Sequence, residues 1–463
     1  MKELYFISNN EKKYEEMKEI VEHDGIKLKL HKHNIEEIQT EDPDELIRHK
    51  ALTAFKEIRR PVLVEHTALT IDAFKNLPGL QTSYFYSKLG YEEIVNYCNY
   101  KQEYGAYVES FFCICDGKRF LISKGKEEGT ITCSKERVDK VVGFAWDKIF
   151  IPTKDNPNEF TYAELGKRKN ERSMRKNAWD KLKKQYSSEL NEFLKEGKEE
   201  NLEELAKLIR ERKVLLFIGA GISASIGFPT WNSLISELGK KQGYEDRIFN
   251  CYGDNMMLAE YVSLENSEEV YEQIERIFKV TPEIKNKLLL SEIYELIYKL
   301  DFPVIYTTNY DALLETYYFA EGRDFDKVVN IEDMKETDLN RTRIMKFHGD
   351  IDDRESIVLS ESQYFKRMDF QHFMDVQLQA DMLKYHILFL GYSLADINVK
   401  LLLYYGRKRN NDKMQAYIYT STPNQVQKDV FNKNGITTFS GRDAEKQFGT
   451  LQFLKKLVKL VED

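Results

Sequence analysis

The chain has 463 residues, a length that accommodates two or three domains of ordinary size. Its 69 lysines and arginines against 77 aspartates and glutamates give a net charge of −8, which disfavours wrapping around nucleic-acid phosphates. Hydrophobic residues make up 42% and prolines number 9, so the composition is that of a folded chain and not of a disordered one. The apolar run at 214–221 is too short to span a membrane, and Met1 leads straight into a strand-like run without a signal peptide, so we expect a cytoplasmic protein.

Two strand–turn–helix openings lie far apart in the chain. In the first, the apolar run 4–7 leads into Ser8-Asn9-Asn10 and a charged helical stretch; in the second, the run 214–218 leads into Gly219-Ala220-Gly221. A short apolar strand that feeds a polar or glycine turn and then a helix is typical of an α/β unit. We therefore predict two α/β domains, at 1–186 and 205–463, joined by a helical linker at 187–204.

The first domain mixes strands and helices, whereas the second alternates them regularly. Strands of the first domain are predicted at 61–65 and 104–115, and its helices at 44–58 and 170–186. Strands of the second domain are predicted at 213–218, 304–307, 343–347, 387–390, 416–419 and 437–439, and helices at 291–300, 370–384, 398–407 and 444–461. The alternation predicts a doubly wound, Rossmann-like parallel sheet that binds ligands at the carboxyl ends of its strands.

The stretch between the two domains is almost free of glycine and proline and carries leucines at helical spacing. Gly197 interrupts the pattern, and we place the domain boundary within about ten residues of it. A helical connector can transmit a movement or an oligomeric contact more readily than a flexible tether.

Five cysteines, at 98, 113, 115, 133 and 251, are too few and too scattered for a disulfide framework. Cys113 and Cys115 would point the same way from a strand, and we expect ordinary buried thiols there in preference to a metal pair. Because no two Cys pairs have zinc-site spacing, we expect no zinc.

The first opening carries residues that suit an anion. Ser8-Asn9-Asn10-Glu11-Lys12-Lys13 places small polar groups on a strand-to-helix turn, with a lysine one turn into the helix. Free backbone N–H groups and the positive end of the helix dipole favour an anion there. Taken alone, the pattern is more typical of a plain helix cap with a solvated lysine.

Six further segments follow this turn in order: Glu36-Glu37-Ile38-Gln39-Thr40-Glu41, Pro61-Val62-Leu63-Val64-Glu65-His66-Thr67-Ala68-Leu69, Leu77-Pro78-Gly79, Gly143-Phe144-Ala145-Trp146-Asp147, Thr161-Tyr162-Ala163-Glu164-Leu165 and Lys169-Asn170-Glu171-Arg172-Ser173-Met174-Arg175. Over about residues 1–186 this set resembles the inosine triphosphate pyrophosphatase family. Its members cleave non-standard purine triphosphates to monophosphates.

The resemblance implies a purine triphosphate site in the first domain. The triphosphate would be held by Ser8, Asn10, Lys13, Lys50 and Lys169. A hypoxanthine-like base would be enclosed by Phe144, Trp146, Asp147, Ser173 and Arg175. These residue types suit the roles, because lysines neutralise phosphates, an aromatic ring offers a stacking face and an arginine can donate to a six-oxo group that adenine lacks.

Two departures from the family pattern predict a change of function. His66 stands where the family has an Asp tied to Mg²⁺ and the attacking water, and Met174 stands where it usually has a His beside the base. Imidazole is a poor substitute for carboxylate on Mg²⁺, although Glu41 and Glu65 remain as candidate ligands for an ion bound with the triphosphate. We predict a pocket that keeps its grip on the triphosphate and has lost most of its hydrolysis. An active enzyme with a tolerated substitution is the alternative.

The second opening begins a set of motifs that suit a dinucleotide. Gly219-Ala220-Gly221-Ile222-Ser223 is followed in order by Gly227-Phe228-Pro229-Thr230-Trp231, Thr307-Thr308-Asn309-Tyr310-Asp311, Lys346-Phe347-His348-Gly349-Asp350, Gly391-Tyr392-Ser393-Leu394, Asp396 and Asn398. A lone Gly-x-Gly turn is weak evidence. All these segments, however, would meet at one edge of the sheet, where a dinucleotide crevice forms.

Over roughly residues 205–420 this set resembles the sirtuin fold, and specifically its bacterial defence branch. The resemblance implies that His348 is the base, that Asn309 positions the reacting ribose or a water, and that Asp311 supports that loop. NAD⁺ would be held by Gly219, Ala220, Gly221, Ser223, Phe228, Pro229, Trp231, Thr308, Gly391, Ser393, Asp396 and Asn398. Taken alone, His348 would fit a strand-end histidine capped by its own loop, but the ordered set favours the base.

Breaking the nicotinamide–ribose bond builds oxocarbenium character, so such a site needs orientation and charge stabilisation more than a strong nucleophile. Histidine is suited to accept the proton at physiological pH. Protein-deacylating sirtuins carry a four-cysteine zinc module after this histidine, and the interval from His348 to Gly391 contains no cysteine. Water is therefore the expected acceptor, which predicts an NAD⁺ glycohydrolase that releases nicotinamide and ADP-ribose.

A degraded triphosphate pocket joined to an NAD⁺-cleaving domain resembles the Kongming-type anti-phage arrangement, in which a pyrophosphatase-like component binds deoxyinosine triphosphate and a sirtuin-like component destroys NAD⁺. We predict a homo-oligomeric defence effector that deoxyinosine or inosine triphosphate switches on, with a separately encoded deaminase as a functional partner and without membrane or nucleic-acid partners. The alternatives are a bifunctional enzyme that still hydrolyses non-standard triphosphates and a non-catalytic nucleotide-binding scaffold.

Two segments have no place in these motifs. Tyr404-Tyr405-Gly406-Arg407-Lys408-Arg409 mixes aromatic and basic residues, and we expect a solvated helix end there in preference to a nucleic-acid site. The helical stretch 256–299 lies between two predicted strands of the sheet. It would either cover the NAD⁺ crevice or make subunit contacts.

Overall fold

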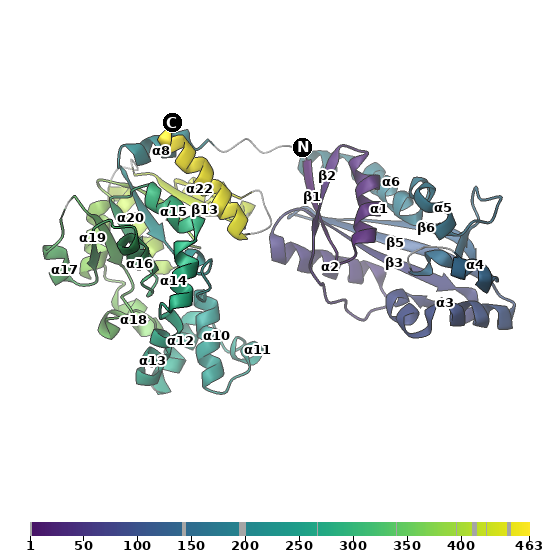
Figure 1. Ribbon diagram of the computed structural model, residues 1–463, viewed down its shortest axis with the longest axis horizontal. Coiled ribbons are helices and arrows are strands. Elements are labelled where there is room, and N and C mark those ends of the chain that lie inside the picture. The colour runs from purple at the N-terminus through teal and green to yellow at the C-terminus, as the bar shows by residue number, and fades with distance from the viewer. Residues whose placement is uncertain are drawn as a thin grey trace. The chain divides into compact units, whose positions relative to one another are not determined.

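The computed structural model describes residues 2–140, 145–193, 201–265, 267–338, 340–394, 396–409, 414–422, 424–441 and 446–463. Its chain divides into two compact units, Met1–Lys198 and Glu199–Asp463 (Figure 1). Phe144, predicted at the base, and Gly197, predicted at the boundary, lie outside the described residues.

The first unit is built on a mixed seven-stranded sheet in the order β2-β1-β3-β5-β6-β7, with β4 paired to β3. Strand β1 runs parallel to β2 and β3, and the other pairs are antiparallel. This confirms the predicted mixed α/β class. The strands are β1 Lys2–Ile7, β2 Ile26–His31, β3 Val62–Ile71, β4 Leu77–Gly79, β5 Gly105–Cys115, β6 Phe120–Ile131 and β7 Phe150–Pro152.

The helices of the first unit are α1 Glu11–Glu22, α2 Pro43–Ile58, α3 Thr82–Lys101, α4 Lys135–Lys140, α5 Tyr162–Leu165, α6 Met174–Gln185 and α7 Ser187–Phe193, with 3₁₀ turns at Asp72–Phe74, Ala145–Lys148 and Gly166–Glu171. Helix α6 packs directly on β6, because a Cβ at Gly125 would lie 1.9 Å from the Met174 carbonyl oxygen. Two apolar clusters, around Leu4, Phe112 and Trp179 and around Val108, Phe150 and Tyr162, form the core.

The second unit is built on a seven-stranded sheet in the order β10-β11-β9-β8-β12-β13-β14. Every neighbouring pair is parallel, which confirms the predicted doubly wound sheet. The strands are β8 Val214–Ile218, β9 Val304–Thr307, β10 Phe325–Val328, β11 Thr342–Lys346, β12 His386–Leu390, β13 Ala416–Thr420 and β14 Ile436–Ser440.

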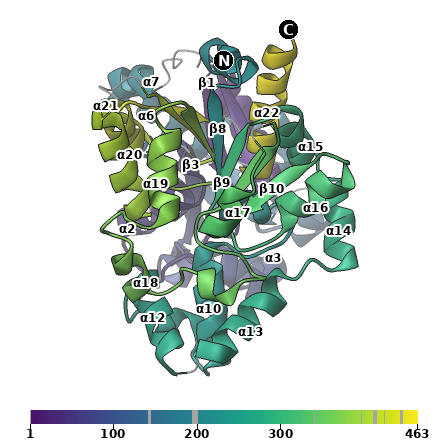
Figure 2. The ribbon, with the colours of Figure 1, turned by 90° about the vertical axis from the view of Figure 1, so that its left-hand side faces the viewer.

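Helices cover both faces of this parallel sheet (Figure 2). They are α8 Glu203–Arg210, α9 Ala220–Ser223, α10 Trp231–Lys241, α11 Asp246–Phe249, α12 Asn255–Glu265, α13 Ser267–Phe278, α14 Pro282–Leu289, α15 Glu292–Lys299, α16 Leu313–Ala320, α17 Ile331–Lys335, α18 Glu361–Lys366, α19 Phe373–Asp381, α20 Ile397–Arg409, α21 Gln425–Lys433 and α22 Lys446–Glu462, with a 3₁₀ turn at Arg354–Ser356. The Tyr404–Arg409 segment forms the last turns of α20, as expected for a helix end.

The helical insertion between β8 and β9 comprises α12 to α15, and α10 and α12 to α13 lie together beside α18 (Figure 2). Its side chains contact the segment that follows β11. Arg354 pairs with Glu268 at 3.0 Å and with Glu275 at 2.5 Å, and the Ser362 amide donates to Glu260 at 2.9 Å. The insertion is therefore joined to the loop after His348.

The five cysteines are free, and Cys113 and Cys115 are buried thiols on β5, as predicted. Burial raises the pKa of the Cys113 thiol well above its ordinary value. Within the described part of the chain, none of the helices combines the length and the apolarity that a bilayer-spanning segment requires.

Candidate functional site

The turn between β1 and α1 is held by its own polar side chains. Asn10 Oδ1 accepts from the Lys13 amide at 3.1 Å and caps α1, and Ser8 Oγ accepts from the Asn10 amide at 3.0 Å. This cap fixes the first turn of the helix, which directs Lys13 at the buried Glu65 on β3, with Nζ 3.0 Å from Oε2. The predicted triphosphate residues of this turn thus lie next to a carboxylate.

Arg175 and Lys169 extend this contact into a network of alternating charge. Arg175 Nε lies 3.2 Å from Glu65 Oε1, and its Nη1 donates to Glu16 on α1. Lys169 Nζ lies 2.6 Å from Glu16 and 2.7 Å from Asp147. The structure therefore brings together Lys13, Lys169, Asp147 and Arg175 from four separate segments. Glu16, which the sequence analysis missed, bridges two of them, and it shares with Lys13 one face of α1 at i, i+3 spacing.

Burial and the neighbouring cations oppose each other in this network. Burial alone would raise the pKa values of Glu65 and Glu16, but the adjacent arginine and lysines hold both pKa values below their ordinary range. Burial lowers the pKa of Lys13 in spite of the Glu65 carboxylate, and it raises the pKa of Asp147 in spite of Lys169. The network therefore holds cations that carboxylates already neutralise.

Lys50 and His66 meet at a second carboxylate, Glu37. Lys50 Nζ lies 2.5 Å from Glu37 Oε1 and 3.3 Å from the Glu65 carbonyl oxygen. His66 Nδ1 lies 3.5 Å from the same Glu37 oxygen, and its Nε2 lies 2.9 Å from the Leu80 carbonyl oxygen. The hydrogen bond with His66, with Lys50 beside it, lowers the pKa of Glu37 to about 2. Glu37 belongs to the acidic run at 36–41, but no role was predicted for it.

Two other predicted base residues, Trp146 and Ser173, are buried. Trp146 is buried against Phe150 and Tyr162, with each pair of ring centroids 6.0 Å apart. Ser173 caps α6 by accepting from the Lys176 amide at 3.3 Å. Met174 is fully buried, and its sulfur accepts from the Tyr162 hydroxyl at 3.8 Å. Where the family usually has a histidine, this chain thus presents a thioether to the core.

The residues at the expected metal position do not fit Mg²⁺. In the described residues there is no group of three or more His, Cys, Asp or Glu side chains that could hold a metal ion. Glu41 is exposed, and both oxygens of Glu65 accept from cations and hydroxyls. Mg²⁺ in a nucleotide site is bound through one or two carboxylates together with substrate phosphates, and here Glu65 is already paired with two cations while His66 replaces the other carboxylate.

In the second unit, four neighbouring strands end at one edge of the sheet and carry the predicted NAD⁺ motifs. The turns after β8 and β12 are in direct contact: the Gly221 amide donates to the Gly391 carbonyl oxygen at 2.9 Å. A Cβ at Gly219 would lie 2.5 Å from that same oxygen, and Gly391 has a φ of +61°. Ala220 and Gly221 remain partly or fully exposed, so their backbone can approach a ligand.

Asn309, after β9, is oriented by a relay of hydrogen bonds. Its Nδ2 donates to Ser223 Oγ at 2.9 Å, and Ser223 Oγ donates to Asp311 Oδ2 at 2.7 Å. Asp311 Oδ1 also accepts from the Leu313 amide at 3.1 Å at the start of α16. Ser223 and Asp311 are buried while Asn309 is partly exposed, so the relay holds the amide of Asn309 in one orientation at the surface.

His348, after β11, meets the predicted Asp396 from the segment after β12. Its Nε2 lies 3.1 Å from Asp396 Oδ2, and its Nδ1 lies 3.3 Å from the Tyr364 hydroxyl. The amides of Asn398 and Val399 donate to Asp396 Oδ1 at 2.8 and 3.2 Å. Burial would raise the pKa of Asp396, but His348 and these amides hold it below its ordinary value. The sequence analysis did not predict Tyr364, whose backbone oxygen accepts from Asn398 Nδ2 at 3.2 Å.

A buried lysine, also missed, joins the segments that carry Asn309 and His348. Lys346 Nζ donates to the Asp311 carbonyl oxygen at 2.6 Å and lies 3.3 Å from both Glu315 and Asp350. Burial raises the pKa of Glu315 in spite of this lysine. The sequence contained a signal for this ion pair, because a lysine that ends a central strand is buried and therefore needs an acidic or polar partner.

The remaining predicted NAD⁺ residues surround these groups. Phe228 is buried with its ring 5.4 Å from Phe278 of the insertion, and Phe278 also lies 6.0 Å from Tyr310. Thr308, Gly391, Pro229 and Trp231 are partly exposed and Ser393 is exposed, whereas Asn398 is fully buried. The insertion therefore lies against the predicted crevice, which favours the first of its two expected roles.

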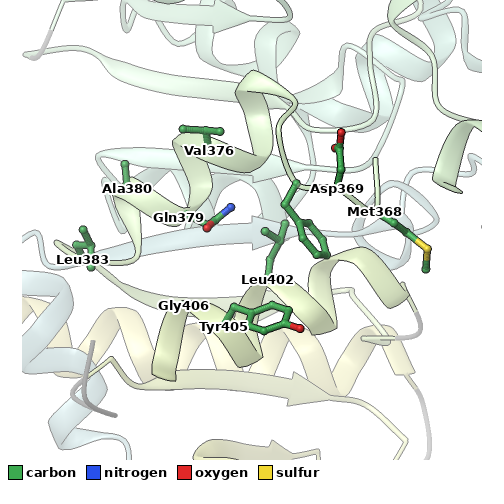
Figure 3. A pocket seen from close by; sticks show the side chains of 10 residues that line it. Met368, Asp369, Val376, Gln379, Ala380, Leu383, Leu402, Tyr405 and Gly406 are labelled. Atoms are coloured by element: carbon green, nitrogen blue, oxygen red, sulfur yellow. The ribbon is translucent and has the colours of Figure 1, made fainter. Parts of the chain in front are cut away.

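A hollow of about 640 Å³ lies between α19 and α20 (Figure 3). Its lining is Met368, Asp369, Phe370, Val376, Gln379, Ala380, Leu383, Leu402, Tyr405 and Gly406. It contains no residue of the four strand-end segments, so it is not the predicted NAD⁺ site.

Comparison with known proteins divides the chain in the same way. Residues 4–185 match the Ham1 family, and residues 303–439 match a SIR2-like domain. The inosine triphosphate pyrophosphatase of Kluyveromyces lactis is 34% identical over 187 residues, which are 39% of this chain and 94% of that protein.

The second half is similar to larger proteins. The NAD(+) hydrolase ThsA of Bacillus cereus is 27% identical over 206 residues, which are 44% of this chain and 41% of ThsA. Defense-associated sirtuin 2 of Bacillus subtilis is 24% identical over 259 residues, which are 52% of this chain and 24% of that protein. The chain thus spans less than half the length of either relative.

Proposed function

The chain belongs to the Ham1 family through residues 4–185, and on that premise we propose that its first unit senses a non-standard purine triphosphate and that its SIR2-like unit hydrolyses NAD⁺. Deoxyinosine or inosine triphosphate is the expected activator, and nicotinamide and ADP-ribose are the expected products. The observation that supports the hydrolase most directly is the convergence of Asn309, Asp311 and His348 at one edge of a parallel sheet, each tied to a buried partner.

The geometry supports a simple division of labour. The Ser223 relay holds the Asn309 amide, which positions the ribose or the attacking water. As the nicotinamide–ribose bond breaks, water adds to the sugar carbon, and neutral nicotinamide leaves with the bonding electron pair. His348 accepts the proton of that water, and the adjacent Asp396 carboxylate stabilises the imidazolium that results.

Sensing requires that the triphosphate favour the active arrangement over the resting one. An activator with an about 100-fold preference for the active arrangement would supply about 2.7 kcal/mol of bias. Lys13 and Lys169 of the first unit supply counter-charges that a triphosphate needs. NAD⁺ depletion by the activated chain would stop phage replication, in keeping with the defence function that the name of the Bacillus subtilis relative states.

One experiment tests both halves of this proposal. The pure full-length protein is incubated with NAD⁺ and a panel of nucleoside triphosphates while nicotinamide and pyrophosphate are both measured. We expect nicotinamide release only with deoxyinosine or inosine triphosphate, and no pyrophosphate. Nicotinamide produced at full rate without any triphosphate would contradict the sensor, and pyrophosphate released by the Asn309→Ala protein would favour the bifunctional enzyme.

Matched variants separate the two sites. His348→Ala should lower NAD⁺ hydrolysis by about 10²–10⁴-fold. If hydrolysis is lost while the fold is retained, the hypothesis of a non-catalytic scaffold is excluded. Lys13→Met should raise the triphosphate concentration that gives half-maximal activation, because it removes a counter-charge. The control is Lys12→Met, since the neighbouring Lys12 is exposed.

A further inference from the structure

The Glu65 carboxylate of the first unit accepts from four donors, two of which are cations. Its side chain is fully buried, Lys13 Nζ lies 3.0 Å from Oε2, and Arg175 Nε lies 3.2 Å from Oε1. Ser110 Oγ donates to Oε1 at 2.9 Å, and the Thr67 hydroxyl donates to the same oxygen. Three donors therefore crowd Oε1, and the other oxygen, Oε2, faces the Lys13 ammonium.

A divalent ion at Glu65 would have to lie beside its two cationic partners or displace them. In either case the ammonium and guanidinium groups would face the ion across a few ångströms of protein interior, where the repulsion between like charges is strong. A third cation, Lys50, lies 3.3 Å from the Glu65 backbone oxygen. The position therefore already contains positive charge from the chain itself.

The imidazole of His66 offers no free lone pair to a metal ion beside Glu65. Nε2 lies 2.9 Å from the Leu80 carbonyl oxygen, which can only accept, so this nitrogen is the donor. Nδ1 is directed at Glu37, with 3.5 Å between Nδ1 and Oε1. Both ring nitrogens thus face oxygens of the chain. Glu37 itself is held by Lys50 at 2.5 Å.

We infer that this site of the first unit binds its nucleoside triphosphate without a divalent cation, and that Lys13, Lys50 and Lys169 supply the positive charge that a metal ion would otherwise bring. On binding, these lysines direct further N–H donors at phosphate oxygens, while Lys13 and Arg175 stay paired with Glu65. The inference rests on the proposed sensing function and deepens it, because a triphosphate bound without a metal ion also lacks a metal-activated water to cleave it.

The test is calorimetric titration of the full-length protein with inosine triphosphate, once with EDTA and once with millimolar Mg²⁺. We expect the same or a tighter apparent Kd in EDTA, because Mg²⁺ in solution competes with the protein for the triphosphate. Binding at least about tenfold weaker in EDTA, equivalent to about 1.4 kcal/mol, would overturn the inference and leave the sensor intact. No binding in either buffer would overturn the proposed sensor as well.

Three variants sharpen this result. His66→Asp restores a second carboxylate beside Glu65, so its binding of inosine triphosphate should become tighter with Mg²⁺ than with EDTA. Glu57→Gln is the control, because Glu57 is an exposed carboxylate on α2 outside the predicted site, and its Kd should match that of the parent chain in both buffers. A Glu41→Gln protein that loses affinity only in Mg²⁺ would show that Glu41 holds a metal ion, and would overturn the inference.

Discussion

His348 meets a carboxylate and a phenol on opposite sides of its ring. Asp396 lies at Nε2 and Tyr364 at Nδ1, and the histidine is only 3% exposed. Because two backbone amides fix the carboxylate, its negative charge is available to an imidazolium without rearrangement. The sequence analysis placed Asp396 among the residues that contact NAD⁺, and the structure places it 3.1 Å from His348, the proposed base.

We predict that Asp396→Asn lowers kcat for NAD⁺ hydrolysis by about tenfold or more and changes KM little, because the variant removes the charge that stabilises protonated His348. Steady-state kinetics at saturating activator measures both constants. Glu355→Gln, which changes an exposed carboxylate in the segment after His348, is the control and should behave like the parent chain. An unchanged kcat in Asp396→Asn would remove Asp396 from the mechanism.

Glu127 on β6 is a buried carboxyl group outside both sites. Its Oε1 has no hydrogen-bond partner among the described residues, and its Oε2 accepts only a long bond from Asn177 Nδ2, at 3.5 Å. Burial raises the pKa of Glu127 to about 7, and Arg172 and Lys154 do not compensate. Between its ordinary pKa and pH 7 the folded chain therefore holds a proton that the unfolded chain lacks.

This proton contributes stability that is fully present at acid pH and is lost as the pH rises through about 7. Glu127→Gln should therefore raise the thermal midpoint of the first unit at pH 8 and leave it nearly unchanged at pH 5. Thermal unfolding across this range measures the effect. Glu128→Gln changes the exposed neighbour on the same strand and should show no such pH dependence.

At the scale of secondary-structure elements, the second unit depends on close contact between the turns after β8 and β12. Gly219 has no room for a side chain, because a Cβ there would lie 2.5 Å from the Gly391 oxygen and 2.8 Å from Tyr392 Cα. Both atoms belong to backbone that cannot rotate away. The glycines of this motif thus permit the contact that forms the floor of the proposed crevice.

Gly219→Ala should separate these two turns, lower the thermal midpoint and raise the KM for NAD⁺. Gly253→Ala is the matched control, because the nearest atom to its Cβ is the terminal methyl of the flexible Met257 side chain. Differential scanning calorimetry and NAD⁺ kinetics on both proteins make the comparison. A thermal midpoint and a KM for NAD⁺ that both match those of the parent chain in Gly219→Ala would contradict the role assigned to this contact.

The apolar strands were predicted from sequence, and strands β2, β4, β6 and β7 of the first unit were not. Six strands of the parallel sheet are predicted to within about a residue, because strands buried on both faces appear as continuous apolar runs. Strand β6 alternates Lys124, Lys126 and Glu128 with buried positions, so it has no such run. Strand β10 at the sheet edge is short and half-exposed, and it was missed for the same reason.

At the scale of the whole molecule, each unit has its own buried core. Activation in the proposed scheme must therefore pass between two separately packed bodies. The predicted linker 187–204 and an oligomeric interface are the routes we propose for it, and part of that linker lies outside the described residues. The free energy required is small compared with the stability of either core.

By itself, the sequence determined the two α/β classes and which segments lie at the ligand-binding edge of the second sheet. The carboxyl ends of parallel strands meet at the same edge of the sheet whatever the conformation of the loops, so the order of the motifs was sufficient to place these segments together. Only the tertiary structure decided which charges pair. Glu16 meets Arg175 across 159 positions of sequence, and Lys346 meets Asp311 across 35. Ion pairs form between charged groups that are close in space, and the local sequence pattern does not give that distance.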